Sequence, residues 1–276
     1  MNALPEAAGV PGPTCEHREF VTALARGLEV LHAFDRDRAQ MTLSEVARAT
    51  GLSPGTARRC LFTLACLGYV GSQDKRYFLL PKVVSIGAAY LSAARVDEAI
   101  VPYLRDLVSR CGDSSTLAVL DGGFIMHLAS YSSKRLIRMT VGLGTRFPAY
   151  ATSMGRVLLA QLPPERLDAA LESVPRRPFT RYTVTEIAEL KRIVAAARSD
   201  GYARVNDELE DGLSSLAVPV RVNGEVVAAL NSSTFFQAHA DDASRSHRLG
   251  VLRETAETIA GAIRRLPALA HSLSTR

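Results

Sequence analysis

Between Leu43 and Val70, apolar and polar residues follow the 3.6-residue period of two short helices joined by a tight turn. Ser44 is placed as the N-cap of the first helix, and Gly51 ends it because glycine tolerates a left-handed conformation. Ser53 then caps the second helix and Pro54 takes its first position, where a missing N–H costs nothing. The apolar positions expected to face the core from this second helix are Ala57, Cys60, Leu61, Leu64 and Leu67.

The opposite face of the second helix is polar and basic. A capped helix, a glycine turn and a second amphipathic helix with outward arginines are typical of a helix-turn-helix that enters the major groove of DNA. The candidate DNA-binding residues of this unit and of the segment after it are Ser44, Ser53, Gly55, Thr56, Arg58, Arg59, Thr63, Lys75 and Arg76. An ordinary helical hairpin with a solvated arginine face is the alternative interpretation of the same pattern.

Two short apolar runs after this helix predict a β-hairpin. Tyr69-Val70 and Tyr77–Leu80 flank the polar stretch 71–76, which ends in Lys75 and Arg76. A hairpin directly after a recognition helix is a wing, and its basic tip is suited to DNA phosphates.

Helices are predicted on both sides of this unit. The segment Phe20–Phe34 is amphipathic and is expected to bury one face against the helix-turn-helix. The apolar positions assigned to that face are Val21, Leu24, Leu28, Val30 and Leu31. Pro81 opens a helix over Lys82–Ala94 that is apolar over much of its circumference, as expected of a connector buried between domains or subunits. A further helix is predicted from Asp97 to Cys111.

From Ser114 onward the period changes to that of strands interrupted by helices. The predicted strands are Ser115–Leu120, Phe124–Tyr131, Leu136–Val141, Tyr202–Val205, Ser215–Val222 and Val226–Ser232. The predicted helices are Met154–Leu162, Glu165–Glu172, a helix capped by Thr185 that runs to Ser199, and Ala243–Leu266. An antiparallel sheet with helices before, between and after it predicts an α+β domain.

These patterns divide the chain into five expected parts. They are a disordered tail over 1–19, a winged helix-turn-helix over 20–80, a linker helix over 81–96, an effector-binding and oligomerisation domain over 97–268, and a frayed tail over 269–276.

Charge supports the nucleic-acid interpretation. Between Phe20 and Arg95 the chain carries ten basic and five acidic side chains, so this part alone accounts for the net charge of +5. No apolar stretch is as long as a membrane span, and residues 1–19 lack the pattern of a secretory signal. We therefore expect a cytoplasmic protein without a membrane partner.

The rest of the sequence contains no convincing metal-binding or catalytic motif. The four cysteines have no metal-binding spacing, and the segment from His239 to His247 is a poor metal site in a polar loop. Residues 51–55 match the G-x-S-x-G pattern of a hydrolase nucleophile, but Pro54 has no N–H to donate to an oxyanion. The pair Glu208 and Glu210 is interpreted as a solvated turn. We therefore expect no catalytic residues, no metal and no cofactor.

Several motifs in order resemble the IclR family of bacterial transcriptional regulators. They are the helix-turn-helix with its wing, the segment Arg146–Ala160, the Glu208–Leu213 segment and the Leu216–Val220 strand. Within the family the chain is similar to the PcaR, PcaU and PobR branch, and the resemblance runs from about Phe20 to Leu266.

The resemblance implies a winged helix-turn-helix, a linker helix and a GAF-like effector-binding domain. It also implies promoter DNA and a small aromatic or dicarboxylic acid as partners, a homodimer or homotetramer, and contact with RNA polymerase. The effector would shift a population of arrangements of the two winged helices.

Effector contacts follow from the resemblance residue by residue. Thr152, Ser153 and Met154 match a ligand-facing segment, where a helix N-terminus suits a carboxylate. The remaining matches are the polar residues Ser215, Asn231 and Ser233, the apolar walls Leu136, Met139 and Phe147, and Asn206, which stands where an acid is common. Arg138 and Arg146 could clamp a carboxylate with two hydrogen bonds.

Each of these residues also has an ordinary structural interpretation. Thr152 and Ser153 can be helix caps, Asn231 and Ser233 can lie on a solvated strand face, and Arg138 can be an exposed strand arginine. Met139 and Phe147 can be plain core. For the whole chain, the alternative function is a small-molecule-binding or hydrolytic α+β domain whose helical N-terminal part mediates oligomerisation.

Overall fold

The computed structural model describes residues 19–35, 37–132, 142–235 and 242–274. The chain divides into two compact units, residues 1–88 and 89–276, and each is described by itself. The division lies within helix α4 (Val84–Ala94), inside the segment that the sequence analysis assigned to the linker.

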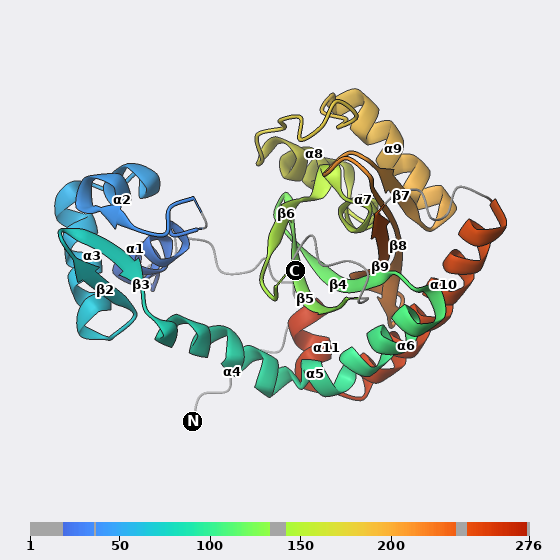
Figure 1. Cartoon of the computed structure of the whole chain (residues 1–276), viewed down its shortest axis with the longest axis horizontal. Helices are drawn as coiled ribbons and strands as arrows, with labels where there is room; N and C mark the ends of the chain where they lie inside the picture. The colour runs from blue at the N-terminus through green and yellow to red at the C-terminus, as the bar shows by residue number, and fades with distance from the viewer. Residues whose placement is uncertain (1–18, 36, 133–141, 236–241, 275–276) are drawn as a thin grey trace. The chain divides into compact units, whose positions relative to one another are not determined.

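The N-terminal unit is a small helical bundle with a three-stranded sheet (Figure 1). Its elements are α1 (Thr22–His32), β1 (Met41–Thr42), α2 (Leu43–Thr50), α3 (Pro54–Cys66), β2 (Val70–Gln73) and β3 (Arg76–Leu79), followed by the 3-10 turn η1 (Pro81–Val83) that leads into α4. The strands pair antiparallel in the order β1-β3-β2. This arrangement is a winged helix-turn-helix, as the sequence predicted.

Apolar side chains from α1, α2 and α3 form one core. Val30, Val46, Ala57 and Leu61 are buried in it. The assignment of Val21, Leu24 and Leu28 to a buried face of α1 was wrong, because these three side chains are exposed and only the last turn of α1 packs inward.

The C-terminal unit is built on a six-stranded antiparallel sheet in the order β6-β5-β4-β9-β8-β7. The strands are β4 (Ser114–Asp121), β5 (Phe124–Tyr131), β6 (Arg146–Pro148), β7 (Ala203–Asn206), β8 (Leu213–Val222) and β9 (Glu225–Phe235). The turns at Gly122 and at Asn223-Gly224 have positive φ angles, which suit tight hairpins. The predicted strand Leu136–Val141 lies outside the described residues.

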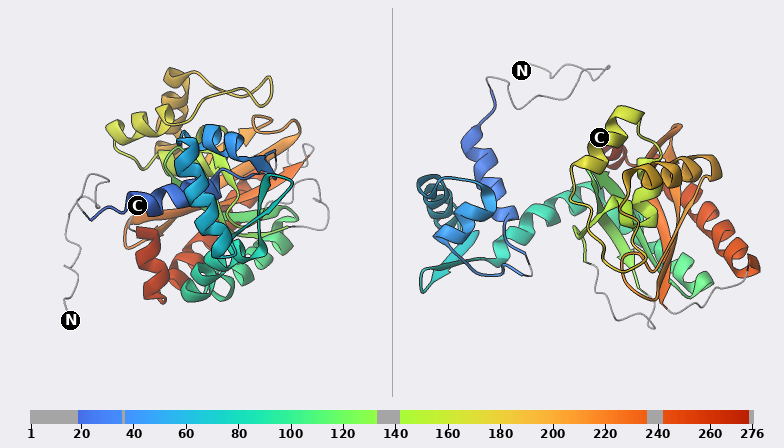
Figure 2. Two further views of the ribbon diagram at one scale, coloured as in Figure 1. Left: turned by 90° about the vertical axis from the view of Figure 1, so that its left-hand side faces the viewer. Right: turned by 90° about the horizontal axis from the view of Figure 1, so that it is seen from above.

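Helices cover both faces of this sheet (Figures 1 and 2). One face packs on α5 (Val96–Ala99), α6 (Val101–Cys111), α10 (Asp242–Arg264) and α11 (Pro267–Ser274). The other packs on the 3-10 turn η2 (Ala149–Ala151), α7 (Ser153–Leu159), α8 (Pro164–Glu172) and α9 (Ile187–Asp200). Alternation along β4 supplies both cores, because Leu117 and Val119 face the first and Ala118 faces the second.

Some helices differ from the sequence prediction. The helix predicted over Asp97–Cys111 is divided into α5 and α6, because Ile100 leaves the helical conformation. Residues 267–274, expected to be largely frayed, form α11, because Leu269 and Leu273 are buried against the sheet. The helix α9 begins after Glu186, and Thr185 provides no side-chain cap. Along the described ranges, no helix is long and apolar enough to cross a membrane.

Candidate functional site

The helix-turn-helix is held by local hydrogen bonds at both helix starts. Thr42, not Ser44, caps α2: its hydroxyl accepts from the Glu45 N–H at 3.3 Å, and Glu45 Oε2 accepts from the Thr42 N–H at 2.7 Å. The prediction for Ser44 as the cap was wrong, since a Thr followed three residues later by Glu makes a reciprocal capping box. The Thr42 N–H and hydroxyl both donate to the Glu45 carboxylate, and these two bonds hold its pKa below the usual value.

The second helix begins as predicted. Gly51 ends α2 with φ +67°, and the Ser53 hydroxyl accepts from the Thr56 N–H at 3.3 Å. Pro54 takes the first position of α3. Because helix α2, and not a strand, precedes Ser53, the G-x-S-x-G match lacks the strand–turn–helix context of a hydrolase nucleophile.

One face of α3 is buried and the other is open to partners. Ala57, Leu61 and Leu64 pack into the core, whereas Arg58 and Arg59 are exposed. The exposed face of the described unit also includes Ser44, Gly55, Thr63 and Lys75, while Thr56 is half-buried. The prediction that Leu67 faces the core was wrong: its side chain is 51% exposed, because α3 ends at Cys66.

The wing is a tight hairpin between β2 and β3. Asp74 and Lys75 both have positive φ angles, as a two-residue hairpin turn requires, and Lys75 lies at the exposed tip. Arg76 bends back toward α2, where its guanidinium lies 3.7 Å from Glu45 Oε2. The two basic residues of the wing therefore have different surroundings.

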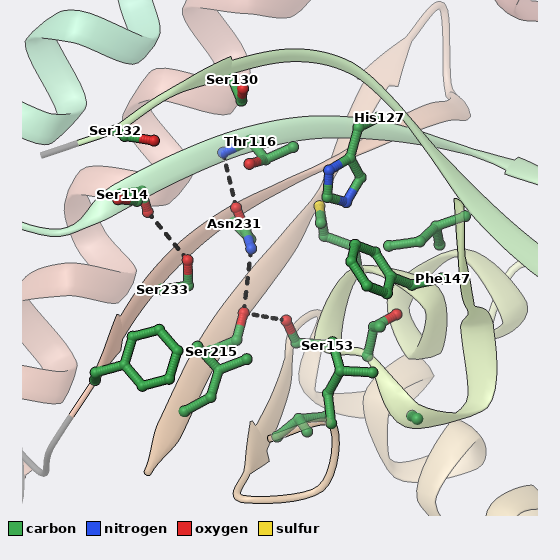
Figure 3. A pocket seen from close by; sticks show the side chains of 18 residues that line it. Ser114, Thr116, His127, Ser130, Ser132, Phe147, Ser153, Ser215, Asn231 and Ser233 are labelled. Carbon is green, nitrogen blue, oxygen red and sulfur yellow. Dashed lines mark hydrogen bonds between the residues drawn. The ribbon is translucent and has the colours of Figure 1, made fainter. Parts of the chain in front are cut away.

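A cavity of about 100 Å³ lies in the C-terminal unit, between the sheet and the start of α7 (Figure 3). This is several times the space of roughly 10–15 Å³ that a single water needs. The residues that line it are Ser114, Thr116, Ile125, His127, Ser130, Ser132, Phe147, Ala151, Thr152, Ser153, Met154, Val205, Leu209, Leu213, Ser215, Asn231, Ser233 and Phe235.

Hydroxyl and amide groups form a connected line across this cavity (Figure 3). Asn231 Oδ1 accepts from the Thr116 N–H at 2.8 Å, and Asn231 Nδ2 donates to Ser215 Oγ at 3.2 Å. Ser215 Oγ is 2.7 Å from Ser153 Oγ. These bonds fix the polar groups of three strands and α7 before any ligand arrives.

The structure brings together seven of the residues that sequence analysis assigned to the effector. Phe147, Thr152, Ser153, Met154, Ser215, Asn231 and Ser233 all line the cavity. Thr152 is also the cap of α7, because its hydroxyl accepts from the Gly155 N–H at 3.0 Å. Leu136, Arg138 and Met139 lie outside the described residues.

Two other candidates point elsewhere. Arg146 pairs with Asp121 at 2.7 Å and lies over the Phe124 ring at an exposed edge, so it does not line the cavity. Asn206 accepts hydrogen bonds from Ser214 (2.7 Å) and Arg204 (3.1 Å) and is likewise absent from the lining.

Sequence reasoning missed Thr116, His127, Ser130 and Ser132. The pairing of β4 with β5 shifts register between Leu117 and Ala118, which leaves one extra residue in β5. This bulge allows Ser130 and Ser132 to share the face of Ile125 and His127, although strict alternation would place them on opposite faces.

A buried ion pair joins α7 to the loop that carries Leu209. Arg156 in α7 makes two 2.7 Å hydrogen bonds to the Glu208 carboxylate, and the two side chains are only 3% and 9% exposed. Glu208 Oε2 also accepts from the Val184 N–H at 3.0 Å. The interpretation of Glu208 as part of a solvated turn was wrong; it anchors the loop that carries Leu209 to the cavity wall.

The start of α7 is packed too closely for a larger residue at Gly155. A Cβ atom at this position would lie 2.1 Å from the Ala149 carbonyl oxygen. Glycine therefore permits the contact between α7 and η2 that closes this side of the cavity.

Each of the two units matches a model of a known protein family. The IclR helix-turn-helix domain model matches residues 23–74, and the model of the bacterial transcriptional regulator IclR C-terminal domain matches residues 88–261. A Pca regulon regulatory protein of Pseudomonas putida is 38% identical over 78% of this chain and 75% of that protein.

Two further relatives have informative names. A p-hydroxybenzoate hydroxylase transcriptional activator of Acinetobacter baylyi is 32% identical over 77% of this chain and 81% of that protein. An IclR homologue of Microbacterium hydrocarbonoxydans, solved with 4-hydroxybenzoate, has a TM-score of 0.71 and 28% identity over 88% of this chain and 100% of that one. With the capped helix-turn-helix, its wing and the C-terminal α+β unit, these matches show that the chain belongs to the IclR family of bacterial transcriptional regulators.

Proposed function

We propose that this regulator binds promoter DNA through α3 and the wing, and that a small aromatic carboxylic acid in the C-terminal cavity changes that binding. The single observation that carries the proposal is the cavity itself, in a chain related to a solved protein that holds 4-hydroxybenzoate. Its apolar walls, Phe147 and Met154 among them, suit a ring, and its hydroxyl groups suit polar substituents.

Each part of the chain has its own role in this proposal. We assign residues 20–80 to DNA binding, 81–96 to the linker, and 97–268 to effector binding and oligomerisation. The exposed residues Arg58 and Arg59 reach base edges or phosphates, with Thr63 beside them, and Lys75 contacts phosphate from the wing. Ser44, Ser53, Gly55, Thr56 and Arg76 complete the proposed surface.

The effector acts by shifting a population. It binds one arrangement of a homodimer or homotetramer more tightly than another, and only this difference in affinity can change how the two winged helices engage DNA. Contact with RNA polymerase and action in the cytoplasm belong to the same proposal.

Fluorescence anisotropy tests this function. The full-length protein is titrated onto labelled DNA from upstream of its own gene, at two salt concentrations, with 4-hydroxybenzoate, protocatechuate, β-ketoadipate or no acid. We expect salt-sensitive binding that survives competitor DNA, and a shift of the curve by at least one aromatic acid. An unchanged curve with every acid contradicts the effector class, and no specific binding to this DNA or to a genomic fragment library contradicts the DNA-binding role.

A cavity-filling variant separates the two activities. Ser215→Phe places a ring among the polar groups of the cavity, so the variant is expected to bind DNA and lose the response to the acid. Thr258→Phe, at an exposed position of α10, is the control and is expected to retain both. A full response in Ser215→Phe would show that the acid acts elsewhere.

A further inference from the structure

We propose that His127 recognises the acidic group of the effector, and that its imidazole takes up one proton from solvent when an anionic effector binds. This inference rests on the proposed function of the cavity. It names the residue that binds the charged group of the ligand.

The His127 side chain is buried at the cavity wall and lacks polar partners. It is 5% exposed, it lines the cavity, and neither ring nitrogen has a hydrogen-bond partner among the described residues. Its ring rests tilted against Phe147, with centroids 5.4 Å apart. Buried polar atoms in native proteins nearly always have a partner, so the two nitrogens are groups that a ligand in the cavity can satisfy.

No other charged group of the described residues faces His127 in the cavity. The neighbouring strands and helix contribute Thr116 from β4, Phe147 from β6, Met154 from α7 and Asn231 from β9, and none of these titrates. The amide of Asn231 is already committed to Thr116 and Ser215.

The charged groups at the edges of the site are paired with each other. Arg146 is paired in β6 with Met126, next to His127, but its side chain pairs with Asp121 at the end of β4. Arg156 of α7 pairs with Glu208. Among the described lining residues, His127 is therefore the group that can become positive beside a carboxylate.

The surroundings of His127 favour the protonated imidazole only when an anionic ligand is bound. Burial lowers the pKa of His127 to about 4, so without a bound anion the imidazole is neutral near pH 7. A carboxylate in contact favours the charged imidazole and raises this pKa. Between the two pKa values, binding of the anion takes up one proton, and affinity falls by up to about tenfold for each unit of rising pH.

The test compares an anionic and a neutral probe of the same shape. Full-length protein is titrated calorimetrically with 4-hydroxybenzoate and with 4-hydroxybenzamide between about pH 5.5 and 8, where the carboxylate is ionised. Repeating each titration in buffers of different ionisation enthalpy counts the protons. We expect uptake approaching one proton with the benzoate and none with the benzamide.

Variants assign the proton to a residue. His127→Gln keeps a polar side chain but cannot take up a proton, so it is expected to bind the benzoate at least tenfold more weakly at pH 6 and without proton uptake. The control His247→Gln changes an exposed histidine outside the cavity and is expected to retain both affinity and uptake. Should His127→Gln fail to fold, the wild-type proton count and the titration of the His127 ring followed by NMR still decide the question.

The outcomes are distinguishable. Benzoate binding by the wild type without proton uptake, or with uptake that persists in His127→Gln, overturns the role of His127 and leaves the proposed function standing. Binding of neither benzoate, protocatechuate nor β-ketoadipate by the wild type overturns the effector class and, with it, the inference.

Discussion

Arg59 lies exposed in the second turn of α3, on the side of the helix away from Ala57 and Leu61. An arginine there can reach a guanine edge or a phosphate without losing any packing. The cap and the buried face stabilise the helix without Arg59. A substitution of Arg59 is therefore expected to change its DNA contact and not the fold.

Arg59→Ala is expected to weaken operator binding by about 1–3 kcal/mol, or roughly 5- to 150-fold, and to leave the fold intact. Anisotropy with operator and random DNA measures both affinities. The matched control is Arg166→Ala, an exposed arginine of α8 in the other unit. An equal loss on both DNAs would indicate a phosphate contact instead of base recognition.

His127 also predicts how the ligand-free C-terminal unit responds to acid. Its pKa is about 4 in the folded state, below the ordinary value of about 6.5 for an unfolded chain. The unfolded state therefore binds more protons in this window, so stability is lost as the pH falls from about 6.5 to 4, by up to about 3 kcal/mol.

Urea unfolding of the full-length protein at pH 7 and at pH 4.5 checks this prediction. His127→Gln is expected to lose about 2–3 kcal/mol less than the wild type between the two pH values. His32→Gln, at an exposed position of α1, serves as the control. Identical acid sensitivity of the wild type and His127→Gln would show that burial of this ring does not set its protonation.

At the scale of elements, α7 depends on partners far away in the chain. Arg156 is the fourth residue of this short helix, and its carboxylate partner Glu208 stands 52 positions later, in the loop between β7 and β8. The pair joins α7 to the loop that carries Leu209 to the cavity wall. Two buried charges cost desolvation energy, so the pair matters mainly through what happens when one partner is removed.

Glu208→Gln is expected to destabilise the C-terminal unit by about 3–5 kcal/mol, because it leaves the Arg156 guanidinium buried without its counter-charge. Thermal and urea unfolding measure the loss. Glu254→Gln breaks an exposed pair with Arg110 and is expected to cost about 0–1 kcal/mol. An equal loss in the free energy of unfolding for the two substitutions would mean that the buried pair stabilises the protein no more than the exposed pair does.

At the scale of the whole molecule, apolar side chains remain uncovered in a single chain. Leu24 and Leu28 of α1 and Val84 and Ile86 of α4 are exposed, although an amphipathic pattern predicts that such residues pack against something. The sequence analysis expected the α4 segment to be buried between domains or subunits. These exposed residues are consistent with the proposed homo-oligomer.

Ile86→Glu is expected to weaken self-association at least about tenfold, because it would bury a charge in an apolar contact. Sedimentation velocity over a concentration series measures this change. Ser85→Glu, an exposed neighbour in the same helix, is the control. An unchanged oligomer in Ile86→Glu would place the interface elsewhere.

The sequence by itself determined the winged helix-turn-helix. The αL turn at Gly51, the cap at Ser53 and the proline at position 54 involve residues a few positions apart, so their spacing can be read directly. The hairpin was also predicted, but with a tip over 71–76, whereas its turn is Asp74-Lys75. The cap at Thr42 was also readable as a capping box, and it was missed because Ser44 has the same chemistry.

Only the tertiary structure decided which residues line the cavity. The bulge in β5 selects which serines face inward, and a bulge depends on pairing with β4 and leaves no periodic signal. The helix α11 exists because the sheet buries Leu269 and Leu273. His127 and the pair Arg156–Glu208 acquire their roles from burial and from contacts between distant segments, which local periodicity does not encode.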